Sequence, residues 1–84
     1  PNPFNPNTTI EYQVPDNMEI SLSIYDLNGR LVKLLDKGYK NRGNHYVVWD
    51  GSGFDNNTVS NGLYIYRLEG ENNITLTKKV ILLK

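Results

Sequence analysis

The chain has 84 residues and no cysteine, so neither a disulfide framework nor a thiolate metal site can stabilise it. Nine basic and nine acidic residues balance, which gives no reason to expect a nucleic acid or an anionic membrane as partner. No apolar run approaches the ~20 residues that span a bilayer, so we expect no stable membrane insertion. The sequence predicts one small domain, residues 1–84, that depends on apolar burial and backbone pairing.

The first six residues, PNPFNP, include three prolines and predict an extended, non-helical leader. Three interpretations are open from these residues alone: a spacer to an upstream segment, a docking peptide, or an edge strand, where proline is tolerated. Because the chain starts with this leader and has no initiator methionine, we expect it to be part of a longer protein.

Strands are predicted for most of the remaining sequence. Alanine is absent, while Val, Ile, Tyr and Thr are frequent, and this composition favours strands over helices. Alternating apolar and polar residues, bounded by turn residues, predict strands at 8–14, 18–25, 31–35, 45–49, 63–68 and 74–83. Asn28-Gly29 predicts a tight hairpin turn with positive φ at both residues. We expect polar segments 36–44 and 50–61 to be loops.

Short strands at even spacing predict an all-β fold, an immunoglobulin-like or fibronectin-like antiparallel sandwich of about seven strands. The leader, residues 1–7, would be the seventh strand. The predicted core consists of the inward residues of these strands: Ile10, Tyr12, Ile20, Leu22, Ile24, Val47, Trp49, Tyr64, Tyr66, Ile74 and Leu76.

Catalytic and metal chemistry find little support in the sequence. His45 is the one histidine, and at the start of a predicted strand it is better suited to packing or hydrogen bonding than to base catalysis. Residues 50–57 are rich in oxygen donors, but Phe54 stands where a calcium loop needs a ligand, which favours an ordinary surface turn. The sequence therefore predicts no enzyme activity, no cofactor and no metal.

Aromatic residues leave a second interpretation open. Tyr12, Trp49, Tyr64 and Tyr66 are expected in the core, since a small domain without disulfides needs their large buried area, but a sugar-binding platform is the alternative. Tyr25, Tyr39 and Tyr46 are expected to be exposed and keep a ligand-binding hypothesis open.

The last segment, residues 77–84, has four apolar residues between lysines. One interpretation is a buried final strand with charged flanking residues. The other is a terminal signal that a receptor reads, with an edge strand open to strand addition.

Taken in order, the leader, IYDLNGRLV, GNHYVVWDG, NGLYIYRLEG and TKKVILLK resemble the type A C-terminal sorting domain of the type IX secretion system of Bacteroidetes and relatives. The chain is also similar to the immunoglobulin-like domain of the flagellar hook-capping protein, which shares the middle motifs. The resemblance covers essentially all 84 residues. Leu63 departs slightly from the family pattern, in which a β-branched residue is more common.

The resemblance implies a non-catalytic domain that directs a secreted cargo across the outer membrane to the cell surface. Its implied partners are an outer-membrane translocon or shuttle, a sortase-like peptidase and an upstream cargo domain. Residues that match the middle motif are Gly43, His45, Trp49, Asp50 and Gly51. The implied sorting or partner-binding residues are Pro1, Asn2, Pro3, Gly62, Tyr64, Lys78, Lys79 and Val80, and we add Lys84 as part of the terminal signal. The leader would then be both domain boundary and edge strand. The alternative function is a structural or carbohydrate-binding accessory module of a cell-surface enzyme.

Overall fold

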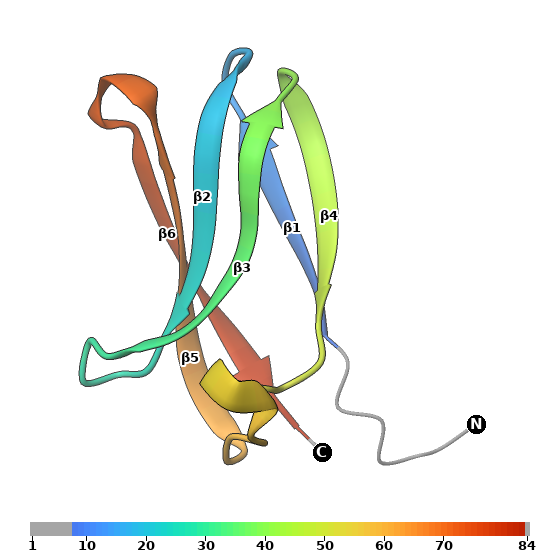
Figure 1. The fold of residues 1–84 in the computed structure, drawn as a ribbon, viewed down its shortest axis with the longest axis vertical. Helices are drawn as coiled ribbons and strands as arrows, with labels where there is room; N and C mark the ends of the chain where they lie inside the picture. Colours follow the sequence, from blue (N-terminus) through green and yellow to red (C-terminus); the bar gives the residue numbers. More distant parts are fainter. Residues whose placement is uncertain (1–7, 84) are drawn as a thin grey trace.

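The computed structural model describes residues 8–83 (Figure 1). These residues form strands and two short 3-10 helices, without any α-helix in that range. The strands are β1 (Thr8–Val14), β2 (Met18–Tyr25), β3 (Leu31–Lys40), β4 (Gly43–Trp49), β5 (Gly62–Gly70) and β6 (Thr75–Leu82). The 3-10 helices are η1 (Phe54–Asn56) and η2 (Glu71–Asn73). Neither of these helices is long enough to cross a membrane.

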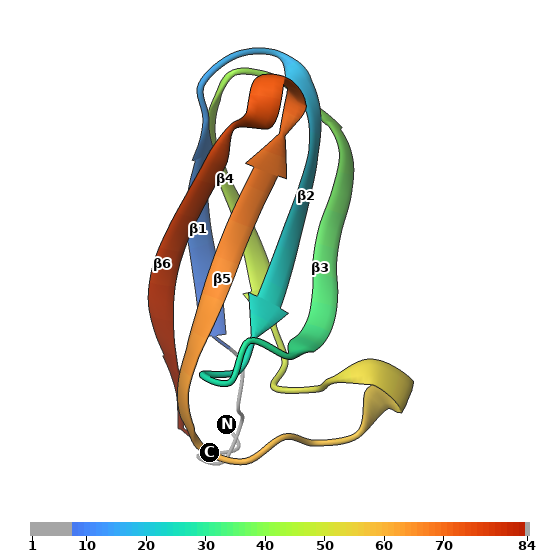
Figure 2. The ribbon, with the colours of Figure 1, turned by 90° about the vertical axis from the view of Figure 1, so that its left-hand side faces the viewer.

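The strands form two antiparallel sheets packed face to face. One sheet has the order β3-β2-β5-β6, and the other consists of β1 and β4. Figure 2 shows the four-stranded sheet in front of β1 and β4. This architecture confirms the predicted all-β, immunoglobulin-like sandwich. Six strands lie within residues 8–83, and the expected leader strand, residues 1–7, lies outside the described residues.

The core lies between the two sheets and contains most of the predicted residues. Its buried apolar members are Ile10, Tyr12, Val14, Met18, Ile20, Leu22, Ile24, Trp49, Tyr64, Leu68 and Leu82. Val47, Tyr66 and Ile74 are half-buried against this core. The prediction for Leu76 is wrong, because its side chain is 47% exposed. Leu76 is on the inner face, but it lies at the edge of the sheet, where no strand of the opposite sheet covers it fully.

The predicted loop at 36–44 is also wrong, because β3 continues to Lys40. Asp36, Gly38 and Lys40 pair with Leu22, Ile20 and Met18 of β2 after a register shift between Leu22 and Ser23. Polar residues are tolerated on this inner face because Tyr12 of β1 donates a 2.8 Å hydrogen bond from its hydroxyl to Asp36.

The hairpin between β2 and β3 forms where predicted, with a different geometry. Within residues 26–30 only Gly29 has positive φ, so the expectation for Asn28 is wrong. The Asp26 carbonyl accepts a hydrogen bond from the Gly29 N–H, and the Asp26 carboxylate accepts bonds from the N–H groups of Asn28 and Arg30. The hydrogen bonds to the Asp26 carboxylate therefore stabilise a turn that is longer than the predicted two-residue hairpin turn.

The partly buried contact between Tyr12 and Asp36 makes stability depend on pH. Burial raises the pKa of Tyr12, and the carboxylate of Asp36 raises it further. Burial also pushes the pKa of Asp36 upward, but the hydrogen bond from Tyr12 and the nearby Lys40 ammonium, 3.3 Å away, hold it below the ordinary value. A lowered carboxyl pKa stabilises the fold above the unfolded-state pKa, and this contribution is lost as pH falls through the folded-state value.

We therefore expect the free energy of unfolding of Asp36→Asn to fall less steeply than that of the wild type as pH is lowered below about 4. Urea unfolding at a series of pH values measures this free energy. At neutral pH the variant should be less stable than the wild type, because the charge-assisted bond from Tyr12 is weakened. Asp16→Asn, which removes a carboxylate from an exposed turn residue outside the contact between Tyr12 and Asp36, serves as the control for the change of charge. If the free energy of unfolding of Asp36→Asn fell with pH as steeply as that of the wild type, Asp36 would not be the source of this pH dependence.

Candidate functional site: the terminal strand and its open edge

The last strand, β6, lies at one edge of the four-stranded sheet, so within residues 8–83 one side of its backbone has no neighbouring strand. An edge position is what strand addition by a partner would require, and that role stays a prediction. Its register with β5 pairs Lys78 with Tyr66, Lys79 with Ile65 and Val80 with Tyr64. Because successive side chains of a strand point to opposite faces, Lys78 and Val80 are on the inner face and Lys79 is on the outer face.

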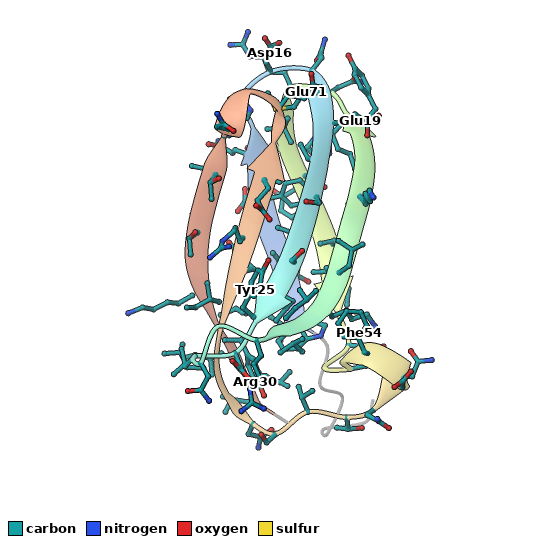
Figure 3. All side chains as sticks on the ribbon, turned by 60° about the vertical axis from the view of Figure 1, so that its left-hand side comes forward. Asp16, Glu19, Tyr25, Arg30, Phe54 and Glu71 are labelled. Carbon is teal, nitrogen blue, oxygen red and sulfur yellow. The ribbon has the colours of Figure 1, made fainter. Side chains whose placement is uncertain are left out.

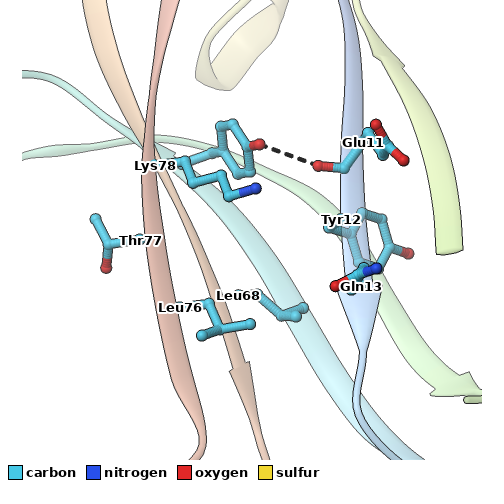
Figure 4. A pocket seen from close by; sticks show the side chains of 8 residues that line it. Glu11, Tyr12, Gln13, Leu68, Leu76, Thr77 and Lys78 are labelled. Atoms are coloured by element: carbon cyan, nitrogen blue, oxygen red, sulfur yellow. Dashed lines mark hydrogen bonds between the residues drawn. The ribbon is translucent and has the colours of Figure 1, made fainter. Parts of the chain in front are cut away.

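The two terminal lysines are therefore presented on different surfaces. Both are exposed. Lys78 extends over the gap between β6 and β1, where its side chain reaches toward the Glu11 region (Figure 4). Lys79 stands on the outer face of the sheet beside Ile65. A partner that contacts both ammonium groups must therefore reach around the free edge of β6.

A groove lies along this free edge, between β6 and β1. Its cavity is about 260 Å³, and it is lined by Glu11, Tyr12, Gln13, Tyr66, Leu68, Leu76, Thr77 and Lys78. The Tyr66 hydroxyl donates a 3.0 Å hydrogen bond to the Glu11 carbonyl across the gap (Figure 4). Leucine side chains form an apolar floor, and Lys78 and Glu11 supply charge at the rim.

Three residues that the resemblance implies as site residues lie at the end of the core: Gly62, Tyr64 and Val80. The Tyr64 hydroxyl donates a 2.6 Å hydrogen bond to the Ser60 carbonyl, and its ring meets the Trp49 ring edge-on at 5.2 Å. Gly62 has φ of +149°, a conformation that side chains rarely adopt. Gly62 and Tyr64 belong to β5 and Val80 belongs to β6, the strand that carries the two lysines. Direct contact of these three residues with a partner stays a prediction.

The remaining predicted site residues fall outside the described part of the chain. Pro1, Asn2 and Pro3 belong to the leader, and Lys84 is the last residue. Their role in partner binding stays a prediction.

The end of the middle motif, Trp49 to Gly51, leads into a turn that is closed by hydrogen bonds to Ser52. The Trp49 indole donates a 2.8 Å hydrogen bond to the Ser52 carbonyl, and the Ser52 N–H and hydroxyl both donate to the Asp50 carboxylate. These bonds hold the pKa of Asp50 below its ordinary value, and the Lys33 ammonium 3.9 Å away adds to the effect. Residues 8–83 contain no group of three or more His, Cys, Asp or Glu side chains placed to hold a metal ion.

The aromatic residues do not form a sugar-binding platform. Tyr12, Trp49 and Tyr64 are buried in the core, and Tyr66 is half-buried, so the platform hypothesis for these residues is wrong. Tyr39 and Tyr46 are exposed as predicted, but Tyr25 is half-buried and lies beneath Arg67.

His45 occupies a packing position, as the sequence predicts. Its ring stacks on the ring of Tyr12 with centroids 5.4 Å apart, and its Nε2 lies 2.7 Å from the Asn41 carbonyl oxygen. Both contacts fix the β4 end of the sandwich.

One pair that sequence reasoning missed is Arg67 with Tyr25, on the outer face of the four-stranded sheet. The guanidinium carbon of Arg67 lies 4.7 Å from the centre of the Tyr25 ring. These residues come from strands β5 and β2, and only the register between the two strands brings them together. Alternation within β5 places Arg67 on the polar side, but it does not identify the aromatic partner.

Known proteins resemble this chain along most of its length. The Salmonella typhimurium "Basal-body rod modification protein FlgD" is 35% identical over 63 residues, which is 75% of this chain and 27% of that protein. The protein of the same name from Salmonella typhi matches to the same extent. The chain thus spans about a quarter of these relatives.

A solved structure shares the fold. The crystal structure of FlgD from P. aeruginosa matches with a TM-score of 0.73 and 19% identity, over 90% of this chain and 59% of that one. At this identity the likeness concerns the fold alone.

A family model described as "Secretion system C-terminal sorting domain" matches residues 1–83. The match includes the leader, the middle motif and β6 with its two lysines. The chain therefore belongs to the secretion system C-terminal sorting domain family.

Proposed function

We propose that this domain directs an attached cargo protein across the outer membrane through the type IX secretion system, toward the cell surface or the medium. The domain itself acts without catalysis. Its partners are the translocon or shuttle that reads the domain and a sortase-like peptidase that separates it from the cargo. The boundary for that separation lies upstream of Pro1, Asn2 and Pro3.

The observation that carries this proposal is the family match over residues 1–83, joined to the position of β6. An edge strand leaves backbone N–H and C=O groups available to a partner strand. Lys78 and Lys79 are exposed on the two faces of that strand. The inner-face residues Val80 and Leu82 pack against the core, so the signal is presented on a folded support.

Export and stability should therefore respond differently to the terminal lysines. The double variant Lys78→Ala with Lys79→Ala should change the free energy of unfolding by less than about 0.5 kcal/mol, as exposed substitutions usually do. In a host with type IX secretion, the same variant should hold a fused reporter in the periplasm. Surface protease accessibility of the reporter and urea unfolding of the purified domain measure the two effects.

The matched control is Lys37→Ala with Arg42→Ala, which also removes two exposed positive charges but leaves every residue of β6 unchanged. The control should export the reporter normally. Full surface display of the terminal double variant would leave β6 as a structural strand and would contradict its role as a signal.

A further inference from the structure

The outer face of the four-stranded sheet carries a cation that no described residue neutralises. Arg67 stacks on Tyr25 with the guanidinium carbon 4.7 Å from the ring centre. Its Nε is buried without a hydrogen-bond partner, and no described residue forms an ion pair with it. A buried donor without an acceptor is rare in folded proteins and calls for a physical reason.

Exposed apolar side chains share the outer face with this stacked pair. The register places Leu34 and Arg67 on either side of Ser23, and Leu31 and Ile65 on either side of Tyr25. Leu63 and Ile81 continue the patch as a cross-strand pair. The exposed members are Leu31, Leu34, Leu63 and Ile81. We call this surface, with Tyr25, Ile65, Arg67 and Lys79, the outer patch.

Two basic residues, Arg67 and Lys79, lie in the outer patch. Glu69 follows Arg67 on the same face of β5, at the border of the patch, and forms no ion pair with either of them among the described residues. Lys79 stands beside Ile65 and adds a second cation that has no described ion-pair partner. Asp16, Glu19 and Glu71 lie together near the opposite end of the sandwich, away from Tyr25 (Figure 3). The outer patch therefore combines exposed apolar side chains with two cations that have no ion-pair partner among the described residues.

We propose that the outer patch is a docking surface for a partner protein that presents a carboxylate between apolar side chains. A planar guanidinium held against an aromatic ring loses little freedom when it binds a carboxylate, and such charge-assisted bonds are strong. The leucine and isoleucine side chains would bury the apolar neighbours of that carboxylate. The inference that this partner belongs to the export machinery rests on the proposed function.

Two other occupants fit the patch less well. A second copy of the chain, docked patch to patch, would bring Arg67 and Lys79 against their own counterparts, and like charges oppose association. An anionic membrane is recognised by clusters of about 4–8 basic residues, whereas this patch has Arg67 and Lys79.

The test uses the peptide acetyl-Leu-Glu-Ile-Glu-Leu-amide as a probe of the proposed chemistry. Added to the isotope-labelled chain at low salt, it should shift NMR signals of Tyr25, Arg67 and Ile65, with the Arg67 side-chain N–H among the largest shifts. The peptide with glutamine in place of both glutamates should bind at least about tenfold more weakly, because the charge-assisted bond is lost.

The variant Arg67→Gln should reduce binding of the acidic peptide by about tenfold or more, and Arg42→Gln, an exposed arginine on another surface, should leave it unchanged. If Arg67→Gln fails to fold, the wild-type shift map together with Lys79→Gln decides the outcome. Absence of shifts, or shifts confined to the groove between β1 and β6, would overturn the proposal. So would equal binding of both peptides.

Two further measurements separate the competing occupants. Binding to vesicles of phosphatidylcholine with phosphatidylglycerol would point to a membrane and overturn the proposal. Concentration-dependent dimers that disappear in Arg67→Gln, measured by analytical ultracentrifugation, would point to a second copy and overturn it too.

Export assays with the fused reporter distinguish this inference from the proposed function. If the wild type reaches the surface and Arg67→Gln does so equally, the outer patch is not the export docking surface, although the sorting role stands. If the wild type stays in the periplasm while the acidic peptide still binds the patch, the sorting role fails and the docking surface stands.

Discussion

Trp49→Ala is expected to lower the free energy of unfolding by about 3–5 kcal/mol, the cost of truncating a large buried aromatic residue. The Trp49 side chain is fully buried. It loses the edge-on contact with Tyr64 and the hydrogen bond to the Ser52 carbonyl at the same time. A domain of this size has a total stability of roughly 5–15 kcal/mol, so this loss removes a large fraction of it and would unfold the domain if its stability is near the lower end of that range.

The neighbouring residue gives a matched control on the same strand. Val48 points to the outer face of β4 and is 53% exposed, so Val48→Ala should cost less than about 1 kcal/mol. Urea unfolding followed by tyrosine fluorescence and circular dichroism measures both variants. A cost for Trp49→Ala no larger than that for Val48→Ala would show that the indole is not a core residue.

Leu82→Ala should cost about 2–5 kcal/mol, although the residue is close to the end of the described chain. Leu82 is fully buried and pairs with Gly62, so its side chain fastens the end of β6 to the core. Chain ends are commonly frayed and tolerant of substitution, and a large effect here would reflect burial rather than position.

Ile81 provides the comparison, because it is adjacent in sequence and lies on the opposite face with 59% exposure. Ile81→Ala should cost less than about 1 kcal/mol in the same urea titration. Equal costs for the two variants would mean that β6 is not docked through its inner face, and the folded support for the terminal lysines would be lost.

Alternation of apolar and polar residues was sufficient to predict the strands that have one buried face and one exposed face. In β1, Ile10, Tyr12 and Val14 are buried while Glu11 and Gln13 are exposed, as a period of two requires. β2 follows the same rule through Ile20, Leu22 and Ile24. Apolar residues at alternate positions have one way to be buried together, and this fixes both the strand and its inner face.

The second half of β3 could not be predicted from such a pattern. Its inner face carries Asp36, Gly38 and Lys40, and a polar inner face is indistinguishable from a loop in the sequence. The contact that makes it favourable, Tyr12 with Asp36, joins residues 24 positions apart. Leu76 was predicted in the core and is exposed. The alternation predicts correctly that it lies on the inner face, but its burial depends on how far the two-stranded sheet extends over it.

The candidate site was predicted in part for similar reasons. The lysines beside the last apolar run and the family resemblance identify Lys78 and Lys79 in the sequence. The register with β5 in the structure places them on opposite faces of β6. The pairing of Arg67 with Tyr25 required the register between β2 and β5, which no local pattern contains. Gly62 and Tyr64 were expected to be site residues, and the contacts of Tyr64 with Ser60 and Trp49 give these positions a role in supporting β6.

The most direct test of the sorting role is the location of a reporter fused upstream of this chain in two strains that differ only in the type IX translocon. We expect protease-accessible reporter at the surface or in the medium of the strain with the translocon, and retention in the periplasm of the strain without it. The same location in both strains, whether inside or outside, would contradict the account.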